Sequence, residues 1–393
     1  MKYIRYGSQT IDKSDVQSVN KCLTSSFLTT GPAIIKFENS FCKYTGSKYS
    51  LACSSGTSAL HMAFLSIGLK KNDNIILPSI NFIAAANMCN LIGANIFFAD
   101  VDQISGQMTP QTLIACFKRH KIKKIKAFCT MYHGGIPNNA KEFYKIKKKF
   151  KCFLIEDSCH ALGGMYSRKN NEYVGNCKYA DISTFSFHPV KSITTGEGGM
   201  LTTNKKELIS KAKLFRNHGI TKKYLKENNN WFYQIEDIGF NYRMNEIQAS
   251  LGISQLKKLN KFINKRNMIA KKYKLLFSKY SFIKQVDSYN NDLKSAWHLY
   301  VINFSFKNLK ISKNDFIQKL HKKKIGVQVH YIPNNLQPLY AKNKYLLIGA
   351  KKYFENSLSI PIYPNLKMNE MKKVVNSIVE LTKKYKKNKS TIF

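Results

Sequence analysis

The sequence predicts an α/β protein with a mostly parallel sheet in a large domain, followed by a smaller α+β domain. Two observations carry the prediction: short apolar runs alternate with helix-length stretches from about residue 50 to 240, and a long helical pattern follows. The apolar runs, which we expect to be strands, are Ile75–Leu77, Ile96–Phe98, Ala127–Met131, Cys152–Ile155 and Ile182–Phe187. Between them, Thr109–Lys118 and Asn139–Phe150 suit crossover helices. Functional sites in such sheets gather at the carboxyl ends of the strands.

A Lys-rich helix is predicted next, because apolar residues recur there at roughly helical spacing. These residues are Ile247, Leu251, Leu256, Leu259 and Ile263. The helix can bridge two units, so we place a large domain at 1–243 and a smaller domain at 244–393, with the first residues of the chain as candidates for packing on the smaller domain. In the smaller domain we expect strands at Ala296–Phe304 and Ile325–His330, and helices at Asp315–Lys324 and Glu370–Lys383.

The net charge of +41 raises the question of a nucleic-acid partner. Only six of the 64 basic residues are arginine, the side chain that nucleic-acid readers prefer. Lysine spread along the whole chain is more typical of solvated faces, so we expect no nucleic-acid partner. A positive surface field would still attract anionic substrates.

The opening residues are mixed in character and do not resemble a signal peptide, and no uninterrupted apolar run is long enough to span a membrane. The nine cysteines are scattered, without a C-x-x-C pair. We therefore expect a cytoplasmic protein with reduced thiols, no membrane contact and no metal site.

Lys191 is the strongest catalytic candidate. A strand-like stretch after Asp181 ends in a turn that presents this lysine, and a Gly-rich return follows as far as Gly199. Its sequence neighbours are apolar, hydroxyl-bearing or glycine, and a desolvated lysine becomes a nucleophile for carbonyl groups. The glycines form no G-x-G-x-x-G array after a strand, which argues against a dinucleotide site.

Each of two further elements can be interpreted either as part of a functional site or as a purely structural feature. Asp157 follows the apolar run at Cys152–Ile155, where a carboxylate can pair with a pyridinium nitrogen or simply cap a helix. His160, three residues later, could orient such a ring. The segment Ser54–Ser58 can form a phosphate cradle at a helix start, or only an N-cap. Phe82 follows another strand, and burial statistics alone favour a core position for it.

Taken together, these motifs resemble the DegT/DnrJ/EryC1/StrS sugar aminotransferases, in the order that the family shows. The matching segments are Ser54–Leu60, Pro78–Asn87, Ile155–Gly163, Phe185–Lys191, Gly239–Ala249 and Gln328–Pro333. The resemblance extends from about Arg5 to Pro364. It implies the aspartate-aminotransferase fold (fold type I of the enzymes that use pyridoxal phosphate) and a homodimer with active sites at the subunit interface.

The resemblance also implies roles for individual residues. Lys191 matches the lysine that forms a Schiff base with pyridoxal 5'-phosphate, Asp157 matches the partner of the pyridine nitrogen, and His160 matches a ring contact. Phe82 sits where an aromatic side chain covers the ring. The phosphate would be held by Gly56, Thr57, Ser186 and, from the neighbouring subunit, Asn241. His330 and Tyr331 match a loop on the sugar-nucleotide side. For Asn241 the ordinary alternative is a cap of the long helix in its own subunit.

Within the family, three stretches most resemble the C4 aminotransferases of pseudaminic acid biosynthesis: Phe187–Gly199, Ser295–Tyr300 and Val329–Pro338. The implied reaction moves the amino group of L-glutamate to the C4 ketone of a UDP-linked 4-keto-6-deoxy-N-acetylhexosamine. The nearest alternative is another nucleotide-sugar C4 aminotransferase, of the perosamine or bacillosamine type. A dehydratase branch of the family has histidine in place of the lysine, so Lys191 argues against it. A basic nucleic-acid-binding protein is the distant alternative.

Overall fold

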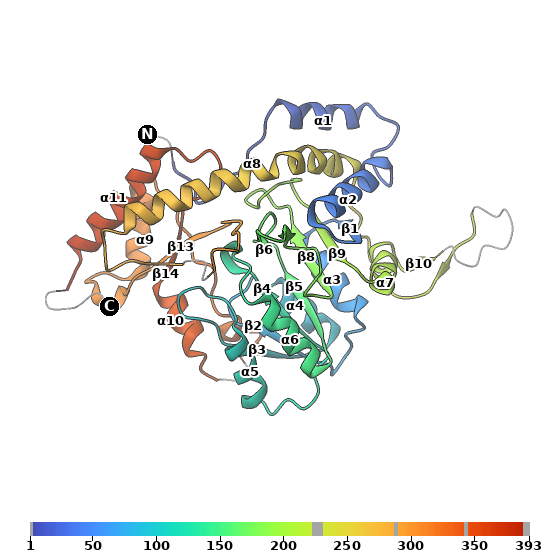
Figure 1. Cartoon of the computed structure of the whole chain (residues 1–393), viewed down its shortest axis with the longest axis horizontal. Coiled ribbons are helices and arrows are strands. Elements are labelled where there is room, and N and C mark those ends of the chain that lie inside the picture. Colours follow the sequence, from blue (N-terminus) through green and yellow to red (C-terminus); the bar gives the residue numbers. More distant parts are fainter. Residues whose placement is uncertain (1–2, 222–230, 287–289, 342–344, 388–393) are drawn as a thin grey trace.

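The computed structural model describes residues 3–221, 231–286, 290–341 and 345–387. One long helix, α8 (Glu246–Phe277), runs along the molecule from a large α/β part to a smaller part (Figure 1). No helix in the described ranges has the length and apolar character needed to cross a membrane.

The large part is organised around a seven-stranded sheet in the order β1-β9-β8-β5-β4-β2-β3. Its strands are β1 (Tyr49–Cys53), β2 (Asn74–Pro78), β3 (Asn95–Ala99), β4 (Ala127–Met131), β5 (Phe153–Asp157), β8 (Ile182–Ser186) and β9 (Gly199–Thr203). All neighbouring pairs from β3 to β8 are parallel, and only β9 runs against both of its neighbours. The prediction of a mostly parallel sheet is thus confirmed, and the five predicted apolar runs form β2, β3, β4, β5 and β8.

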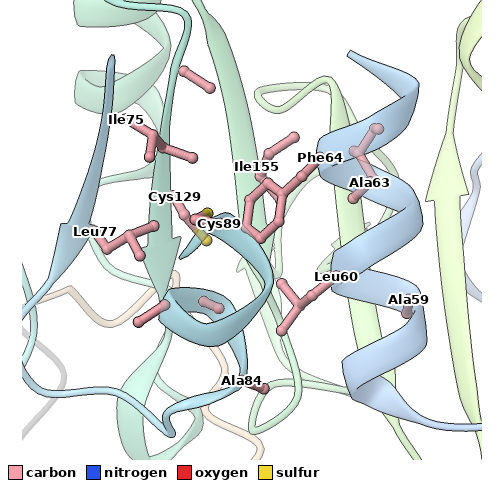
Figure 2. Close-up of a cluster of buried hydrophobic side chains, with 14 of the residues drawn as sticks. Ala59, Leu60, Ala63, Phe64, Ile75, Leu77, Ala84, Cys89, Cys129 and Ile155 are labelled. Atoms are coloured by element: carbon pink, nitrogen blue, oxygen red, sulfur yellow. The ribbon is translucent and has the colours of Figure 1, made fainter. Parts of the chain in front are cut away.

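The helices that follow the strands pack on the sheet; four of them lie between consecutive strands, and α7 follows the last strand, β9. They are α3 (Gly56–Ser66), α4 (Ala84–Ile92), α5 (Pro110–Arg119), α6 (Ala140–Phe150) and α7 (Lys206–Arg216). Helix α5 begins after Thr109, whose hydroxyl accepts from the Thr112 N–H and so caps the helix. In one core cluster, Leu60 and Phe64 of α3 lie against Ile155 of β5 (Figure 2).

Helix α8 connects two hydrophobic clusters. Leu259 and Ile263, in its middle, belong to a core that also contains Ile193 of the large part. Tyr273 and Phe277, near its end, belong to the core of the smaller part. Two N-terminal helices, α1 (Lys13–Leu23) and α2 (Pro32–Thr45), also pack against α8.

The described residues of the smaller part form a three-stranded antiparallel sheet and two α-helices. These elements are β12 (Lys284–Gln285), β13 (Tyr300–Asn303), β14 (Ser357–Ile360), α9 (Lys313–Lys322) and α11 (Met368–Lys384). A further helix, α10 (Ile348–Asn356), instead buries Ala350 and Tyr353 in the core of the large part. Ile4, close to the start of the chain, joins the hydrophobic core of the smaller part, and its N–H donates to the Lys324 carbonyl. In the described residues, two short antiparallel pairs lie outside these sheets: β6 (Met165–Ser167) with β7 (Glu172–Tyr173), and β10 (Ile220–Thr221) with β11 (Gln234–Ile235).

Two strand predictions in the smaller part need correction. The strand predicted at Ala296–Phe304 is shorter, because Trp297 has φ +44°, outside the extended region. The stretch Ile325–His330 is not a strand. It makes only isolated bridges, Ile4 to Ile325 and Gln328 to Ser359, so it switches partners before a ladder can form.

Candidate active site

A cavity of about 410 Å³ lies where the large part meets the smaller part. Its wall includes nine of the ten predicted site residues: Gly56, Thr57, Phe82, Asp157, His160, Ser186, Lys191, His330 and Tyr331. The tenth, Asn241, lies elsewhere. Segments far apart in the sequence thus converge at one place, as the carboxyl ends of parallel strands do in such sheets.

Lys191 occupies a closed turn between β8 and β9. Its N–H donates to the His188 carbonyl at 2.9 Å, and both the Phe187 N–H and the Thr195 N–H make bonds that close the base of the turn. Burial lowers the pKa of Lys191, against the opposite influence of the Cys159 and Asp157 side chains. Loss of hydration thus increases the fraction of neutral, nucleophilic amine.

Asp157 ends β5 and is almost fully buried in the cavity wall. One carboxylate oxygen accepts from Asn81 Nδ2 and the other from the Cys159 N–H, each at 3.2 Å. The chain after Asp157 forms turns rather than a helix, so the helix-cap alternative is wrong. The carboxylate is left with a strong preference for a cationic partner in the cavity.

The start of α3, the candidate anion cradle, faces the same cavity. Ser55 is the N-cap of α3, and its hydroxyl accepts from the Ser58 N–H at 3.1 Å. Gly56 and Thr57 begin the helix, where N–H groups lack intrahelical acceptors and the helix dipole favours negative charge. A Cβ on Gly56 would come within 2.8 Å of Ser186 Cβ, so only glycine lets the helix start approach Ser186. The cap interpretation is therefore confirmed for Ser55, and the cradle at Gly56 and Thr57 stays a prediction.

A wall of three histidines completes the cavity, of which His160 and His298 are buried and His330 is half-buried. His160 Nε2 lies 3.3 Å from the Tyr331 hydroxyl, and His330 Nδ1 lies 2.9 Å from Ser359 Oγ. The His298 ring, which also lines the cavity, is centred 4.1 Å from that of His160. Burial, reinforced by the Lys191 charge, lowers the pKa of all three imidazoles. They therefore stay neutral at physiological pH and present uncharged hydrogen-bonding groups.

Phe82 does not lie in the core, so the position that burial statistics favoured for it is wrong. Its side chain is 55% exposed, and its ring lines the cavity 6.0 Å from that of Tyr331. The reason is local: Phe82 follows β2 at the edge of the cavity, where no other element covers it.

Asn241 is exposed and lies outside its own cavity wall, in an isolated bridge with Asn217. The cap of α8 is instead Asn245, whose side chain accepts from the Gln248 N–H at 2.9 Å. The helix-cap alternative for Asn241 is therefore wrong. Its backbone neighbour Tyr242 accepts from the Ser54 N–H at 2.9 Å, which places this segment beside the start of α3.

Several cavity residues were missed in the sequence, His298 and Cys159 among them. His298 was seen only as part of a family-like stretch, and Cys159 was not considered as a wall residue. Neither has a local signature, because a single histidine or cysteine gains meaning only from its neighbours in space. Within the described ranges, no group of three His, Cys, Asp or Glu side chains is arranged to hold a metal ion.

Known proteins share this architecture and sequence. A model of the DegT/DnrJ/EryC1/StrS aminotransferase family matches residues 9–379. A UDP-4-amino-4,6-dideoxy-N-acetyl-beta-L-altrosamine transaminase of Campylobacter jejuni subsp. jejuni is 36% identical over 386 residues, covering 98% of this chain and 99% of that protein.

Solved structures of aminotransferases superpose on this chain over nearly its whole length. Helicobacter pylori PseC, an aminotransferase involved in the biosynthesis of pseudoaminic acid, superposes with a TM-score of 0.89 at 32% identity, covering 98% of this chain and all of that one. Streptococcus pneumoniae Spr1654 in its PMP form gives a TM-score of 0.88 at 25% identity, with 97% and 99% coverage. The predicted aspartate-aminotransferase fold is confirmed, and the chain belongs to the DegT/DnrJ/EryC1/StrS aminotransferase family.

Proposed function

We propose that this aminotransferase uses pyridoxal 5'-phosphate to move the amino group of L-glutamate to the C4 ketone of a UDP-linked 4-keto-6-deoxy-N-acetylhexosamine, in pseudaminic acid biosynthesis. One observation carries the proposal: Lys191, Asp157 and the anion cradle of α3 face a single cavity. An amine, a carboxylate and a phosphate site are the three groups that this cofactor requires.

The cavity residues fit the cofactor. The N–H groups of Gly56 and Thr57, together with Ser186 Oγ, would hold its phosphate at the start of α3. Asp157 would face its ring nitrogen, and Phe82 would cover its ring. When bound, pyridoxal phosphate supplies an electron sink for the charge that develops on a carbon losing a proton.

Lys191 performs the proton chemistry. In the resting enzyme its Nζ would hold the cofactor until L-glutamate takes its place. The freed amine would then accept the proton from the α-carbon of glutamate, whose nitrogen would stay with the cofactor while water releases the carbon skeleton as 2-oxoglutarate. In the second half of the reaction that nitrogen would pass to the sugar, the ketone oxygen would leave as water, and the same amine would deliver a proton to C4 of the sugar. The lowered pKa of Lys191 suits a group that must both accept and donate a proton near neutral pH.

Asp157 and the histidine wall keep the surroundings of that step fixed. The Asp157 carboxylate, buried and oriented by Asn81, stabilises positive charge on the ring nitrogen. His160 orients the ring, with Tyr331 holding its Nε2. His330 and Tyr331 lie on the smaller-part side of the cavity, where we place the nucleotide sugar.

The uridine nucleotide and the N-acetylated sugar are supported by the C. jejuni transaminase, which aligns over nearly the whole chain. We also infer a cytoplasmic homodimer in which Asn241 of one subunit reaches the phosphate in the other, because Asn241 is exposed and faces no group of its own cavity. The net positive charge would attract the anionic nucleotide sugar.

A substrate panel tests the proposal. Purified protein with cofactor and L-glutamate is assayed against UDP-, GDP- and dTDP-linked 4-keto sugars, and the aminated products are identified by NMR. We expect turnover with the UDP-linked 4-keto-6-deoxy-N-acetylhexosamine and a new amine at C4. Preference for a GDP-linked sugar would support the perosamine-type alternative, and no amination of any sugar would contradict the proposed function.

A further inference from the structure

The turn that carries Lys191 is attached from behind to helix α8. Thr194 connects the two sides of the turn, because its hydroxyl donates to the Phe187 carbonyl and accepts from the Gly196 N–H, both at 3.0 Å. The Thr194 N–H points to Gln255 Oε1 of α8 at 3.5 Å. A shift of Gln255 would therefore be transmitted to the turn.

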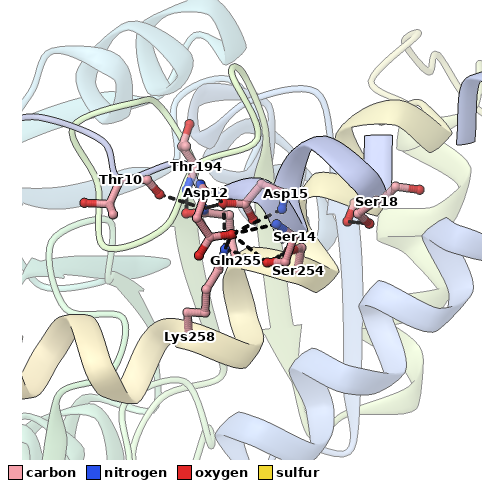
Figure 3. Close-up of polar contacts among 10 residues, drawn as sticks. Thr10, Asp12, Ser14, Asp15, Ser18, Thr194, Ser254, Gln255 and Lys258 are labelled. Carbon is pink, nitrogen blue, oxygen red and sulfur yellow. Dashed lines mark hydrogen bonds and ion pairs between the residues drawn. The ribbon is translucent and has the colours of Figure 1, made fainter. Parts of the chain in front are cut away.

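The orientation of the Gln255 amide is fixed. The side chain is 1% exposed, and its Nε2 donates to the Thr10 carbonyl at 2.9 Å and to Asp15 Oδ2 at 2.8 Å (Figure 3). Both partners only accept hydrogen bonds, so the amide nitrogen must face them and Oε1 must face Thr194. One side chain thus links the N-terminal segment, α8 and the Lys191 turn.

Asp15 of α1 sets the position of Gln255. It is 1% exposed, and its Oδ2 also contacts Lys258 Nζ at 2.6 Å. Lys258 makes a second ion pair, at 2.8 Å, with the exposed Asp12. The two aspartates share a lysine, and the Asp12 N–H donates to Asp15 Oδ2 at 3.0 Å, but it is the Asp15 side chain that accepts from Gln255 (Figure 3).

Bulk solvent cannot replace these bonds. The space among the N-terminal segment, the Lys191 turn and α8 is a cavity of about 10 Å³, lined by Lys191, Thr194, Gln255 and Arg266 among others. A cavity of this size admits at most about one water molecule. The turn is therefore held by side chains rather than by solvent.

We propose that Gln255 is a positioning residue for Lys191 and that Asp15 acts on the turn through Gln255, so that helix α1 sets the geometry of the reacting amine. The inference rests on the proposed function of Lys191. Because misplacement of a reacting group by about 1 Å can cost about a hundredfold in rate, loss of this link reduces turnover without removing any group that touches substrate.

The test compares Gln255→Leu, Asp15→Asn, the double variant and the matched control Asp12→Asn, whose asparagine remains a good helix cap. For each full-length, cofactor-loaded protein we measure kcat, KM and the midpoint pH of the visible absorption band of cofactor bonded to Lys191. We expect Gln255→Leu to lower kcat about tenfold with KM nearly unchanged and to shift the midpoint pH. Asp15→Asn should change kcat and the midpoint pH in the same direction as Gln255→Leu. Asp12→Asn should change neither kcat nor the midpoint pH.

In the double variant, the kcat and midpoint of Gln255→Leu alone are expected, because Asp15 then has no route to the turn. Additive effects, or an unchanged midpoint in Gln255→Leu, would overturn the inference. If Gln255→Leu melts below the assay temperature, the isosteric Asp15→Asn decides: a midpoint equal to that of Asp12→Asn overturns the inference. Peptide mapping of the borohydride-reduced wild-type protein is done first, since label on a lysine other than Lys191 would refute the proposed function instead.

Discussion

Glu156 and Asp157 are consecutive residues of β5, yet their carboxylates lie on opposite faces of the sheet. The Glu156 carboxylate is fully buried and accepts from the hydroxyls of Tyr132, Tyr166 and Ser183 at 2.5–2.6 Å. Asp157 faces the cavity with Lys191. The alternation of side chains along a strand thus places one carboxylate in the core and its neighbour in the cavity wall.

This separation predicts different outcomes for two similar substitutions. Asp157→Asn should lower kcat by about a hundredfold or more, because a neutral amide does not stabilise a positive ring nitrogen. Its melting temperature should stay near that of the wild type. Glu156→Gln is the matched control: it should lower the melting temperature, because an amide cannot accept from three hydroxyls as a carboxylate does, while the folded enzyme keeps its kcat. Near-normal turnover of Asp157→Asn would remove Asp157 from the catalytic site.

Asn241 predicts complementation between two impaired variants. Lys191→Ala lacks the reacting amine, and Asn241→Asp would place a carboxylate against the cofactor phosphate of the partner subunit. After subunit exchange, a mixed dimer contains one cavity with both native residues, so activity should rise above the sum of the separate variants. Exchange is verified by native mass spectrometry. Activity that stays at that sum despite verified exchange would show that Asn241 does not complete a partner's site.

Glu246 should contribute strongly to stability. Its carboxylate is 2% exposed and accepts from the N–H groups of Gly31, Ala33 and Ile34 at the start of α2, at 2.7–3.1 Å. Glu246→Gln should lower the free energy of unfolding by about 2 kcal/mol in denaturant titrations, because charge-assisted bonds at a helix start are lost.

An exposed carboxylate provides the comparison for Glu246. Glu380 pairs with Lys323 at 2.9 Å and is largely exposed, so Glu380→Gln should change the free energy of unfolding by less than about 1 kcal/mol. Equal losses for the two variants would contradict the capping role of Glu246.

His133 predicts a pH dependence of stability. It is 2% exposed, and burial, with His330 and Lys191 nearby, lowers its pKa to about 3. In the unfolded chain its pKa is about 6.5, so between pH 6.5 and 3 only the unfolded state binds the proton. This histidine therefore makes the free energy of unfolding fall by about 1.4 kcal/mol for each pH unit of acidification in that window.

The variant His133→Gln tests this contribution by denaturant titrations between pH 8 and pH 5. Below pH 6.5, the free energy of unfolding of the variant should change less steeply with pH than that of the wild type. The difference corresponds to the uptake of about one proton on unfolding. At pH 8 both states are neutral at this position, so the difference there reports only the loss of packing and of the bond between His133 Nε2 and the Tyr353 hydroxyl. Parallel curves for the two proteins across the whole range would contradict the prediction.

Local sequence patterns predicted most of the large sheet, because β2, β4, β5 and β8 are apolar runs bounded by turns. They did not identify β1 and β9, whose residues include serine, threonine and glycine. Gly199 shows why β9 is special: a Cβ there would lie 2.2 Å from the Ser55 carbonyl oxygen, so the strand must begin with glycine to pass the start of α3. Such a requirement is set by tertiary packing and leaves no periodicity to detect.

For the site as well, residues in local sequence motifs were predicted, and residues defined only by tertiary packing were missed. Lys191, Asp157 and the start of α3 stand in recognisable motifs, and the structure brings them to one cavity. His298 was missed because it reaches the cavity only through the bend at Trp297. Gln255 was missed because its bond to Asp15 forms only when α1 packs on α8. The His298 ring packs against that of His160, which is more than a hundred residues away in the sequence. Gln255 bonds Asp15, which is 240 residues away.

We propose that Lys191, among the many lysines of this chain, is the amine that carries the reaction. Borohydride reduction of the cofactor-loaded protein, followed by peptide mass mapping, tests this role, with Lys191→Ala treated in parallel. We predict that the reduced cofactor is found on the peptide containing Lys191, and that Lys191→Ala binds cofactor without covalent attachment and does not aminate substrate. Label on another lysine, or substantial turnover by Lys191→Ala, would contradict the account.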